Sequence, residues 1–319
     1  MTPTRLPLLL LTLTLASPAL AQGRLLERKL NSELQLTTGR LVHQAKVRRY
    51  HYHVPPQARA GQALPVLFVL HGGLGTGPLQ AKVTQFTRLA DAEGFLVVFP
   101  DSVEHGRNNR QWNDGREGFL GQGDPSKTDD VGFFRELFDR VVEAHGADPK
   151  RIYLTGHSNG SMMSQRLAIE LSERIAAIAV VQGHLPQPLR GEIPQRPMPF
   201  LLITGTADPH NPYQGGTTPV LGGGTLLSAQ ENVRYWVDRN GGTPRTVTTP
   251  LPDLDPEDGT TVEKTEVLGL NAPVVLYTVQ GGGHIWPGTE AQALPGSGSR
   301  NNDIDASRVV WDFVSKHTR

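Results

Sequence analysis

The chain has 319 residues, no cysteine, and 31 basic side chains that balance 31 acidic ones. This balance gives no electrostatic attraction to a nucleic-acid backbone or an anionic membrane, so we expect neither of them as a partner. We expect the substrate to be neutral or small. Without cysteine the chain can form no disulfide and carry no lipoprotein anchor, and its stability must come from an ordinary hydrophobic core. No His-x-x-x-His pattern or paired acidic cluster supports a metal site, and no cofactor is expected.

The first 21 residues are typical of a signal peptide. Arg5 follows a short polar start, residues 6–15 are apolar, and Ala19-Leu20-Ala21 offers a small-x-small cleavage site. No later stretch approaches the roughly 20 apolar residues that a membrane-spanning helix needs. We therefore expect a secreted protein, extracellular or periplasmic, with no membrane anchor, whose residues 22–319 form a single domain.

The pattern of apolar residues changes along the chain. Residues 34–54 alternate apolar and polar positions, which predicts a pair of antiparallel opening strands. Continuous apolar runs follow, and runs without alternation are buried on both faces, as in parallel strands covered by helices. The predicted parallel strands are 66–70, 95–99, 152–154, 175–181, 200–203 and 274–279.

Segments with helical spacing separate these runs. Gly94, Gly146 and Gly241 end three of the apolar stripes, and Ser228 with Glu231 predicts a capping box that opens the helix ending at Gly241. The stripes lie at 83–90, 131–142, 163–171, 233–237 and 306–313. Because strand and helix alternate throughout, the sequence predicts an α/β protein with a doubly wound, mostly parallel sheet and antiparallel opening strands.

A candidate nucleophile lies between the third predicted parallel strand and the helix that follows it. The sequence Gly156-His157-Ser158-Asn159-Gly160 has the G-x-S-x-G pattern of a nucleophile elbow, in which a strained strand-to-helix turn exposes the serine hydroxyl. Both glycines are needed, because a side chain there would collide with the neighbouring strand or helix. The alternative interpretation is a Gly-rich turn whose serine does no chemistry.

The end of the first predicted parallel strand is a candidate oxyanion hole. His71-Gly72-Gly73-Leu74 follows that strand, where backbone N–H groups can stabilise the negative charge of a tetrahedral intermediate. We expect one donor from Asn159 and the other from Gly73 or Leu74. His71 itself is expected to pack and form hydrogen bonds rather than act as an acid or base.

Asp208 and His284 each follow a predicted parallel strand closely. Their order along the chain after Ser158 is the order that the α/β-hydrolase fold uses. His284 would then take the proton of the Ser158 hydroxyl, and Asp208 would fix the tautomer of the imidazole. Weaker replacements are Asp238 or Asp253 for the acid and His184 or His210 for the base.

Three further side chains are candidates for substrate contact. Trp112 could form a wall or lid of the cleft, or could equally anchor a long loop. Trp286, two residues beyond His284, is the best aromatic candidate for contact with an acyl group, and His157 is expected to order the elbow and border the substrate. A polar cluster at 302–305 could hold a cation, but capping of the last helix is the simpler account.

With these residues in place, the chain resembles the secreted esterase family that includes polyhydroxybutyrate depolymerases and feruloyl esterases. The resemblance rests on HGG at 71–73, WNDG at 112–115, DDVGF at 129–133, GHSNG at 156–160, GTADPHNPY at 205–213 and GGGHIWPG at 281–288.

The resemblance implies an α/β-hydrolase fold and hydrolysis of carboxylic esters through an acyl-enzyme, with Ser158 as nucleophile, Asp208 as acid and His284 as base. Family members that act on solid polyester often have cysteines near the oxyanion loop and an appended binding domain. This chain has neither, which favours amorphous polymer, oligomers or plant-wall phenolic esters over crystalline polymer. The alternatives are a serine peptidase or acyltransferase on the same fold, and an inactive polymer-binding protein.

Overall fold

A ten-stranded sheet organises the fold of the computed structural model, which describes residues 18–59, 61–105, 110–117, 127–219 and 223–319. Its strand order is β1-β2-β4-β3-β5-β6-β7-β12-β11-β10. The strands are β1 (Thr37–His43), β2 (Lys46–His53), β3 (Leu64–Leu70), β4 (Leu96–Pro100), β5 (Ala147–His157), β6 (Ala177–Val181), β7 (Phe200–Gly205), β10 (Gly242–Pro250), β11 (Thr261–Leu270) and β12 (Val274–Gln280), and β8 (Gly216–Thr217) pairs with β9 (Thr225–Leu226) in a separate ribbon.

The strands from β4 to β12 in the sheet order are parallel to their neighbours, and antiparallel strands flank them at both edges. These parallel strands are the continuous apolar runs that the sequence predicted, and β1 paired with β2 is the predicted opening hairpin. The predicted α/β-hydrolase architecture is therefore confirmed.

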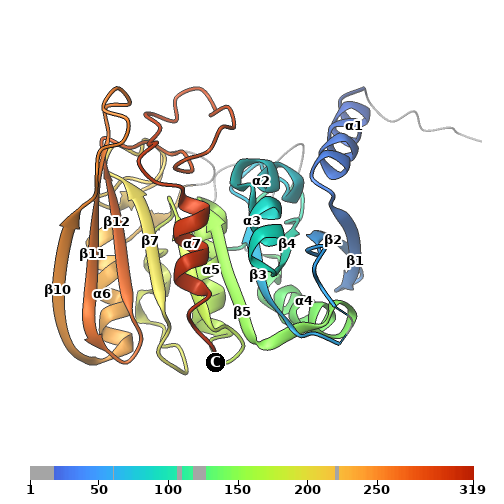
Figure 1. Ribbon diagram of the computed structural model, residues 1–319, viewed down its shortest axis with the longest axis horizontal. Helices are drawn as coiled ribbons and strands as arrows, with labels where there is room; N and C mark the ends of the chain where they lie inside the picture. The colour runs from blue at the N-terminus through green and yellow to red at the C-terminus, as the bar shows by residue number, and fades with distance from the viewer. Residues whose placement is uncertain (1–17, 60, 106–109, 118–126, 220–222) are drawn as a thin grey trace, which may run out of the picture.

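Helices cover both faces of the sheet (Figure 1). Side chains of α4, α5 and α6 share one buried cluster with one face of the strands, and side chains of α2, α3 and α7 share a second cluster with the other face. The helices are α1 (Pro18–Glu33), α2 (Gly77–Thr84), α3 (Phe86–Glu93), α4 (Asp130–His145), α5 (Asn159–Glu170), α6 (Ala229–Asn240) and α7 (Ala306–Val314), with a short 3-10 helix η2 (Gln187–Gly191).

Helix ends follow the predicted capping chemistry. The Ser228 hydroxyl and the Glu231 carboxylate form the reciprocal capping box of α6, and Gly94 and Gly146 end α3 and α4 in left-handed conformation. The carboxylate of Asp305 accepts the N–H groups of Ser307 and Arg308 at the start of α7, so this part of the polar cluster at 302–305 caps a helix, as the simpler account predicted.

Two features of the fold differ from the sequence prediction. The stripe at 83–90 is divided between α2 and α3, because Gln85 adopts a left-handed backbone conformation with φ of 53°. The antiparallel β10–β11 hairpin was not predicted, since nearly every residue of β10 is exposed and the strand lacks a buried apolar face that would produce alternation.

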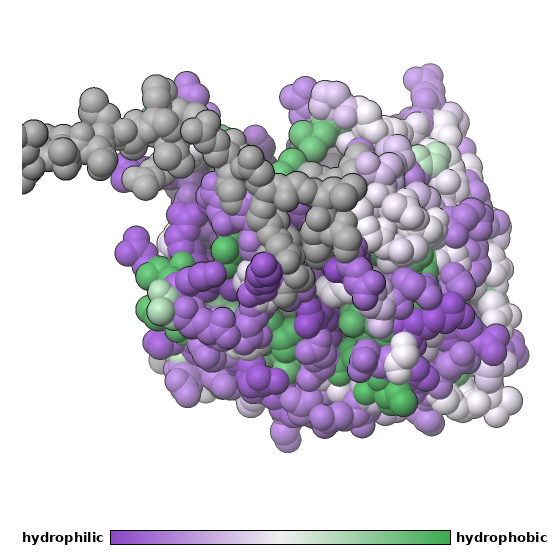
Figure 2. All heavy atoms as spheres, turned by 180° about the vertical axis from the view of Figure 1, so that it is seen from behind, coloured by the Kyte–Doolittle hydropathy of each residue, from purple (hydrophilic) through white to green (hydrophobic). Residues whose placement is uncertain are grey.

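The outer surface is mostly polar. The face turned away from the view of Figure 1 is covered mainly by hydrophilic residues, with hydrophobic side chains scattered in small groups (Figure 2). In the described part of the chain no helix is long and apolar enough to cross a membrane. Residues 1–17 of the predicted signal peptide lie outside the described residues, and α1 begins at Pro18 and runs through the predicted cleavage site.

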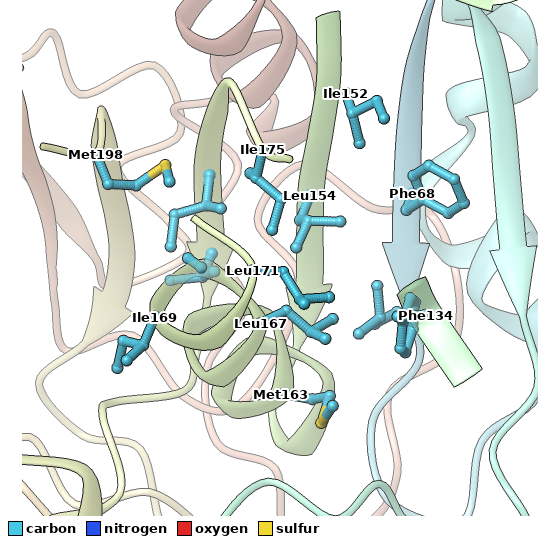
Figure 3. Packing of buried hydrophobic residues seen from close by; sticks show 14 of the residues in the cluster. Phe68, Phe134, Ile152, Leu154, Met163, Leu167, Ile169, Leu171, Ile175 and Met198 are labelled. Atoms are coloured by element: carbon cyan, nitrogen blue, oxygen red, sulfur yellow. The ribbon is translucent and has the colours of Figure 1, made fainter. Parts of the chain in front are cut away.

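The core beneath α5 determines where the chemistry-bearing loops emerge. Leu167 and Leu171 lie against Leu154 of β5 and belong to the same buried cluster as Phe68 of β3 (Figure 3). Within the sheet, β4 lies on one side of β3 and β5 lies on the other, so the chain passes across β3 between β4 and β5. The carboxyl ends of β3 and β5 therefore flank the switch point of the topology, where ligands bind in open α/β sheets.

Candidate active site

Ser158 occupies the turn between β5 and α5 in a strained conformation. Its φ is 57° and its ψ is −122°, a region that non-glycine residues rarely adopt and that tends to occur at functional sites. Its N–H donates to the carbonyl of Val181 at 3.0 Å, which fixes the turn against the end of β6. The side chain is half-buried rather than enclosed. This is the exposed serine geometry that the G-x-S-x-G pattern predicted.

The two glycines of the elbow allow close backbone approach. A Cβ added at Gly160 would collide with the carbonyl oxygens of Leu70 and His71, and one added at Gly156 would collide with the backbone of Gly160. The end of β3 and the start of α5 therefore pack backbone to backbone. Because of this packing, the loop after β3 passes directly over the serine, and a Cβ on Gly72 would lie 3.2 Å from the Cβ of Ser158.

Backbone N–H groups surround the position where an oxyanion would form. Asn159 is the first residue of α5, so its N–H has no acceptor within the helix and lies at the positive end of the helix dipole. Among the described residues, no group accepts the N–H of Gly73. The N–H of Leu74, by contrast, donates to the carbonyl of Arg110 at 2.7 Å. Of the two predicted alternatives on this loop, the geometry therefore favours Gly73 over Leu74.

His71 holds the shape of this loop. Its Nε2 accepts the N–H of Ser102 at 3.1 Å, so the proton must reside on Nδ1, which donates to the carbonyl of Gly72 at 2.7 Å. Burial lowers the pKa of His71 to about 4. The imidazole is thus a neutral structural bridge, in agreement with the packing role expected for it.

The segment 112–116 fastens the oxyanion loop to the elbow. The indole N–H of Trp112 donates to the carbonyl of His71 at 3.0 Å, and its backbone N–H donates to Oδ1 of Asn159 at 2.7 Å. The amide of Asn159 also donates to Asp114, which forms a buried ion pair with Arg116 at 2.9 Å. Trp112 is fully buried, and this favours the anchoring role for it over a wall or lid of the substrate cleft.

Asp208 and His284 meet at the carboxyl ends of β7 and β12. Nδ1 of His284 lies 2.7 Å from Oδ2 of Asp208, while Oδ1 of Asp208 accepts the N–H groups of His210 and Asn211 at 2.8 Å. Burial alone would raise the pKa of Asp208, but the hydrogen bond and positive field of His284, with the two N–H donors, lower it instead. The carboxylate is therefore charged at neutral pH. It holds the proton of His284 on Nδ1 and leaves Nε2 as an acceptor.

Two other imidazoles flank His284. The ring centroid of His157 lies 4.8 Å away and that of His210 lies 4.9 Å away, nearly perpendicular. Burial, and then the field of His284, lower the pKa of His157 to about 3 and also lower the pKa of His210. Both rings are neutral at pH 7, so Asp208 is the charged group in contact with His284.

The Ser158 hydroxyl forms no hydrogen bond to His284 or to any other described residue. The ring of His157, next in sequence to Ser158, contacts that of His284 in a tilted arrangement, so the hydroxyl and the imidazole lie in the same neighbourhood. Nucleophile and base are often loosely aligned in an empty site and tighten when substrate binds. The acid and base are thus already paired, and the serine is presented beside them without its hydrogen bond.

Comparison with known proteins shows which family shares this arrangement. Residues 65–219 match the model of a family described as the alpha/beta hydrolase fold. The chain is 30% identical over 301 residues to a protein named "Putative esterase NocK" from Nocardia uniformis subsp. tsuyamanensis, a match that covers 90% of this chain and 85% of that protein.

The chain belongs to the α/β-hydrolase family of esterases. It is also 32% identical over 264 residues to "Feruloyl esterase B" from Piromyces equi, covering 80% of this chain and 42% of that protein. Among solved structures, an acetyl xylan esterase from Aspergillus awamori superposes with a TM-score of 0.57 at 15% identity, covering 88% of this chain and 99% of that one, which shows the fold alone. The resemblance to this esterase family that the motifs predicted is confirmed.

Trp286 has a packing role in this hydrolase. Only 2% of its surface is exposed, its indole N–H donates to the hydroxyl of Ser307 at 3.0 Å, and its ring meets that of Phe86 edge to face. Little of the ring is left for a ligand, and the structure favours support of the loop around His284 over direct contact with an acyl group.

Two of the alternative acids and bases are engaged with other residues. Asp238 forms an exposed ion pair with Arg234 on α6, and the Nε2 of buried His184 bonds the Thr204 hydroxyl instead of the serine. His210 reaches the ring of His284 but donates only its backbone N–H to Asp208. Sequence reasoning missed one residue of this site, Gln182, because a glutamine after an apolar strand matches no catalytic motif.

Proposed function

We propose that this protein is a secreted serine esterase that cleaves carboxylic esters through an acyl-enzyme, with Ser158 as nucleophile, His284 as general base and acid, and Asp208 as the orienting carboxylate. The observation that carries the proposal is the 2.7 Å contact of Asp208 with His284 at the same sheet edge as the strained Ser158 turn. A charged, buried carboxylate that bonds the Nδ1 of an imidazole, next to a half-buried serine, has the chemistry of acyl transfer.

The proposed reaction proceeds in two halves. Nε2 of His284 takes the proton of the Ser158 hydroxyl while Oγ attacks the ester carbonyl, and the N–H groups of Gly73 and Asn159 stabilise the oxyanion. The imidazolium then returns the proton to the leaving alcohol. A water molecule, activated in the same way by His284, attacks the acyl-enzyme and releases the acid.

The names of the relatives support several candidate substrate classes. Relatives named feruloyl esterase and acetylxylan esterase, together with a poly(3-hydroxyalkanoate) depolymerase, support feruloyl-type esters and hydroxyalkanoate oligomers or polyester as candidates. Relative kcat/KM for methyl ferulate, short-chain aryl esters and hydroxybutyrate oligomers separates these classes, because the ratio measures differential binding of transition states.

We also propose that the protein is exported and that residues 22–319 form one catalytic domain after removal of residues 1–21. The polar start, apolar run and Ala19-Leu20-Ala21 site support this. N-terminal sequencing of the protein recovered from the medium or periplasm of an expressing bacterium should begin at Gln22. An N-terminus at Met1 would contradict it.

The test of the chemistry is Ser158→Ala. We expect this variant to fold normally and to lose turnover of p-nitrophenyl esters by about 10⁴-fold or more. The matched control is Ser164→Ala on the same helix, whose hydroxyl bonds only backbone carbonyls of Gly160 and Thr155 and which should retain activity. Unchanged turnover by Ser158→Ala would refute the proposal.

Two further measurements separate the alternatives. Covalent labelling of Ser158 by a fluorophosphonate excludes an inactive polymer-binding protein. Faster turnover of amides, or faster transfer to acceptor alcohols than to water, would indicate a peptidase or an acyltransferase instead of an esterase.

A further inference from the structure

A single buried glutamine lies where the three chemistry-bearing segments converge. Gln182 follows β6 directly, is 1% exposed, and has a φ of 54°, in the left-handed region that glutamine rarely adopts. The residue before it, Val181, accepts the N–H of Ser158 at 3.0 Å. The strained backbone of Gln182 therefore continues from the point where the serine turn is attached to the sheet.

The side-chain amide of Gln182 forms hydrogen bonds to the loop that carries His284. Its Nε2 donates to the carbonyl of Gly283 at 2.8 Å and lies 3.4 Å from the carbonyl of Ile285. These carbonyls belong to the residues immediately before and after His284. The backbone on both sides of the imidazole is thus held from one point.

The same residue also holds the segment that carries Asp208. Its Oε1 accepts the N–H of Gly205 at the end of β7 at 3.0 Å, and its backbone carbonyl accepts the side-chain amide of Asn211 at 2.6 Å. The N–H of Asn211 in turn donates to Oδ1 of Asp208. Gln182 therefore joins both partners of the Asp208–His284 pair.

Few side chains can replace this glutamine. The site requires a donor toward Gly283 and an acceptor toward Gly205 from one buried, uncharged group, which an amide supplies and a carboxylate or an aliphatic chain does not. Because these protein groups are buried, they have no ready access to water if the amide is removed. Substitution should therefore let the acid and base segments move relative to the serine.

We propose that Gln182 is the positioning residue that holds the Asp208 and His284 loops in register with Ser158. This inference rests on the proposed function, in which those three side chains act together. Gln182 lies behind the loops and acts through them, so its removal should lower kcat and leave KM little changed.

Asn240, which lies at the amino ends of the strands, is a matched control for Gln182. Asn240 is 1% exposed, and its side chain also makes three hydrogen bonds to backbone, two with Met198 ahead of β7 and one with Ala272 ahead of β12. It therefore ties the same two strands at their amino ends, far from the serine turn. A purely structural loss should look alike at the two positions.

The experiment compares Gln182→Met and Asn240→Leu in the mature full chain. Each substitution keeps the approximate volume and removes the amide. We expect Gln182→Met to lower kcat for a p-nitrophenyl ester by up to about 100-fold with KM little changed, and to shift or broaden the proton NMR signal of the His284 Nδ1–H. Asn240→Leu should lower the unfolding temperature without either change.

A second variant covers the case in which Gln182→Met does not fold. Gln182→Asn keeps an amide but draws it back by one methylene, so its contacts with Gly283 and Gly205 lengthen and we expect an intermediate fall in kcat. The proposal is overturned if kcat of the folded Gln182 variants matches that of Asn240→Leu, or if the His284 Nδ1–H signal is unmoved. That signal reports the Asp208–His284 contact without any turnover. Its behaviour therefore stays informative even if Ser158→Ala were to refute the esterase.

Discussion

The candidate site has two halves that are built differently. The elbow region, residues 70–73 with 156–160, packs backbone against backbone, because Gly156 and Gly160 leave no room for a side chain. In the acid–base region, residues 205–211 with 281–286, the backbone at Gly205 and Gly282 is also in close contact, but the side-chain amides of Gln182 and Asn211 add hydrogen bonds that hold the loops. The first half depends on close backbone packing, and the second also depends on hydrogen bonds from a residue outside its two loops.

This difference separates stability from catalysis. A side chain added at either glycine of the elbow region should disturb the fold itself, since the backbone there cannot move apart without breaking the contact of β3, β5 and α5. Size-conserving substitution of Asp208 or Gln182 should leave the fold and lower activity, since it removes a charge or hydrogen bonds without a steric clash.

The largest effect is expected for Asp208→Asn. The amide can still accept the N–H groups of His210 and Asn211, but it no longer holds His284 in the required tautomer, so kcat should fall by about 10⁴-fold. Steady-state kinetics measures the loss of activity, and thermal unfolding measures any loss of stability. A variant that loses its fold together with its activity would contradict the separation between the two regions.

Charge on Asp208 also affects stability at low pH. Its folded pKa is lowered, so the stability it contributes is present above its unfolded value of about 3.9 and is lost as pH falls through the folded value. The stability that wild type owes to the Asp208 charge, measured against Asp208→Asn, should therefore shrink as pH falls below about 4.

Gly160→Ala should destabilise the protein by about 3 kcal/mol or more, because the new methyl group meets the fixed carbonyls of Leu70 and His71. Chemical denaturation measures the effect. Gly191→Ala at the end of η2 is the matched control, since no atom lies within 4 Å of an added Cβ there, and it should change stability by less than about 0.5 kcal/mol. Equal stabilities of the two variants would show that the elbow region is not closely packed.

His184 provides a smaller, pH-dependent test. Burial lowers its pKa to about 4, below the value of about 6.5 in an unfolded chain. The unfolded state then binds the proton first, so the fold loses stability as pH falls from 6.5 to 4, by about 3 kcal/mol for this group. His184→Gln should flatten the slope of unfolding free energy against pH across that window. An unaltered slope would mean that His184 is protonated in the fold.

The smallest effect is expected for His157→Gln. With a pKa of about 3 this ring stays neutral between pH 5 and 9, although it contacts the ring of His284. The variant should therefore leave the shape of the pH profile of kcat/KM unchanged, even if its absolute rate shifts. Movement of the acidic limb of that profile would show that the two imidazoles titrate together.

The same contrast explains what the sequence could predict. The elbow region could be predicted because the geometry of the turn requires its two glycines, which lie close to the serine in the sequence. The parallel strands could be predicted because strands buried on both faces show no alternation of apolar and polar residues. Asp208 and His284 were identified from their places after such strands, and the structure joins them at 2.7 Å.

The other features of the site depend on contacts between residues that are distant in the sequence. Leu74 and Gly73 are equivalent by sequence, and only the bond of the Leu74 N–H to Arg110 distinguishes them. Trp112 and Trp286 have aromatic side chains that suit a cleft or a core equally, and their burial is set by distant helices. Gln182 could not be found at all, since its partners lie between 23 and 103 positions away along the chain.

The central claim is that Ser158, His284 and Asp208 act as one unit, and a double variant tests it most directly. Once the nucleophile is gone, the acid has nothing left to activate. Ser158→Ala combined with Asp208→Asn should therefore be no slower in ester hydrolysis than Ser158→Ala alone. If the second substitution lowered the rate of the first by a further factor of about 10⁴, the three side chains would be working independently and the account would be wrong.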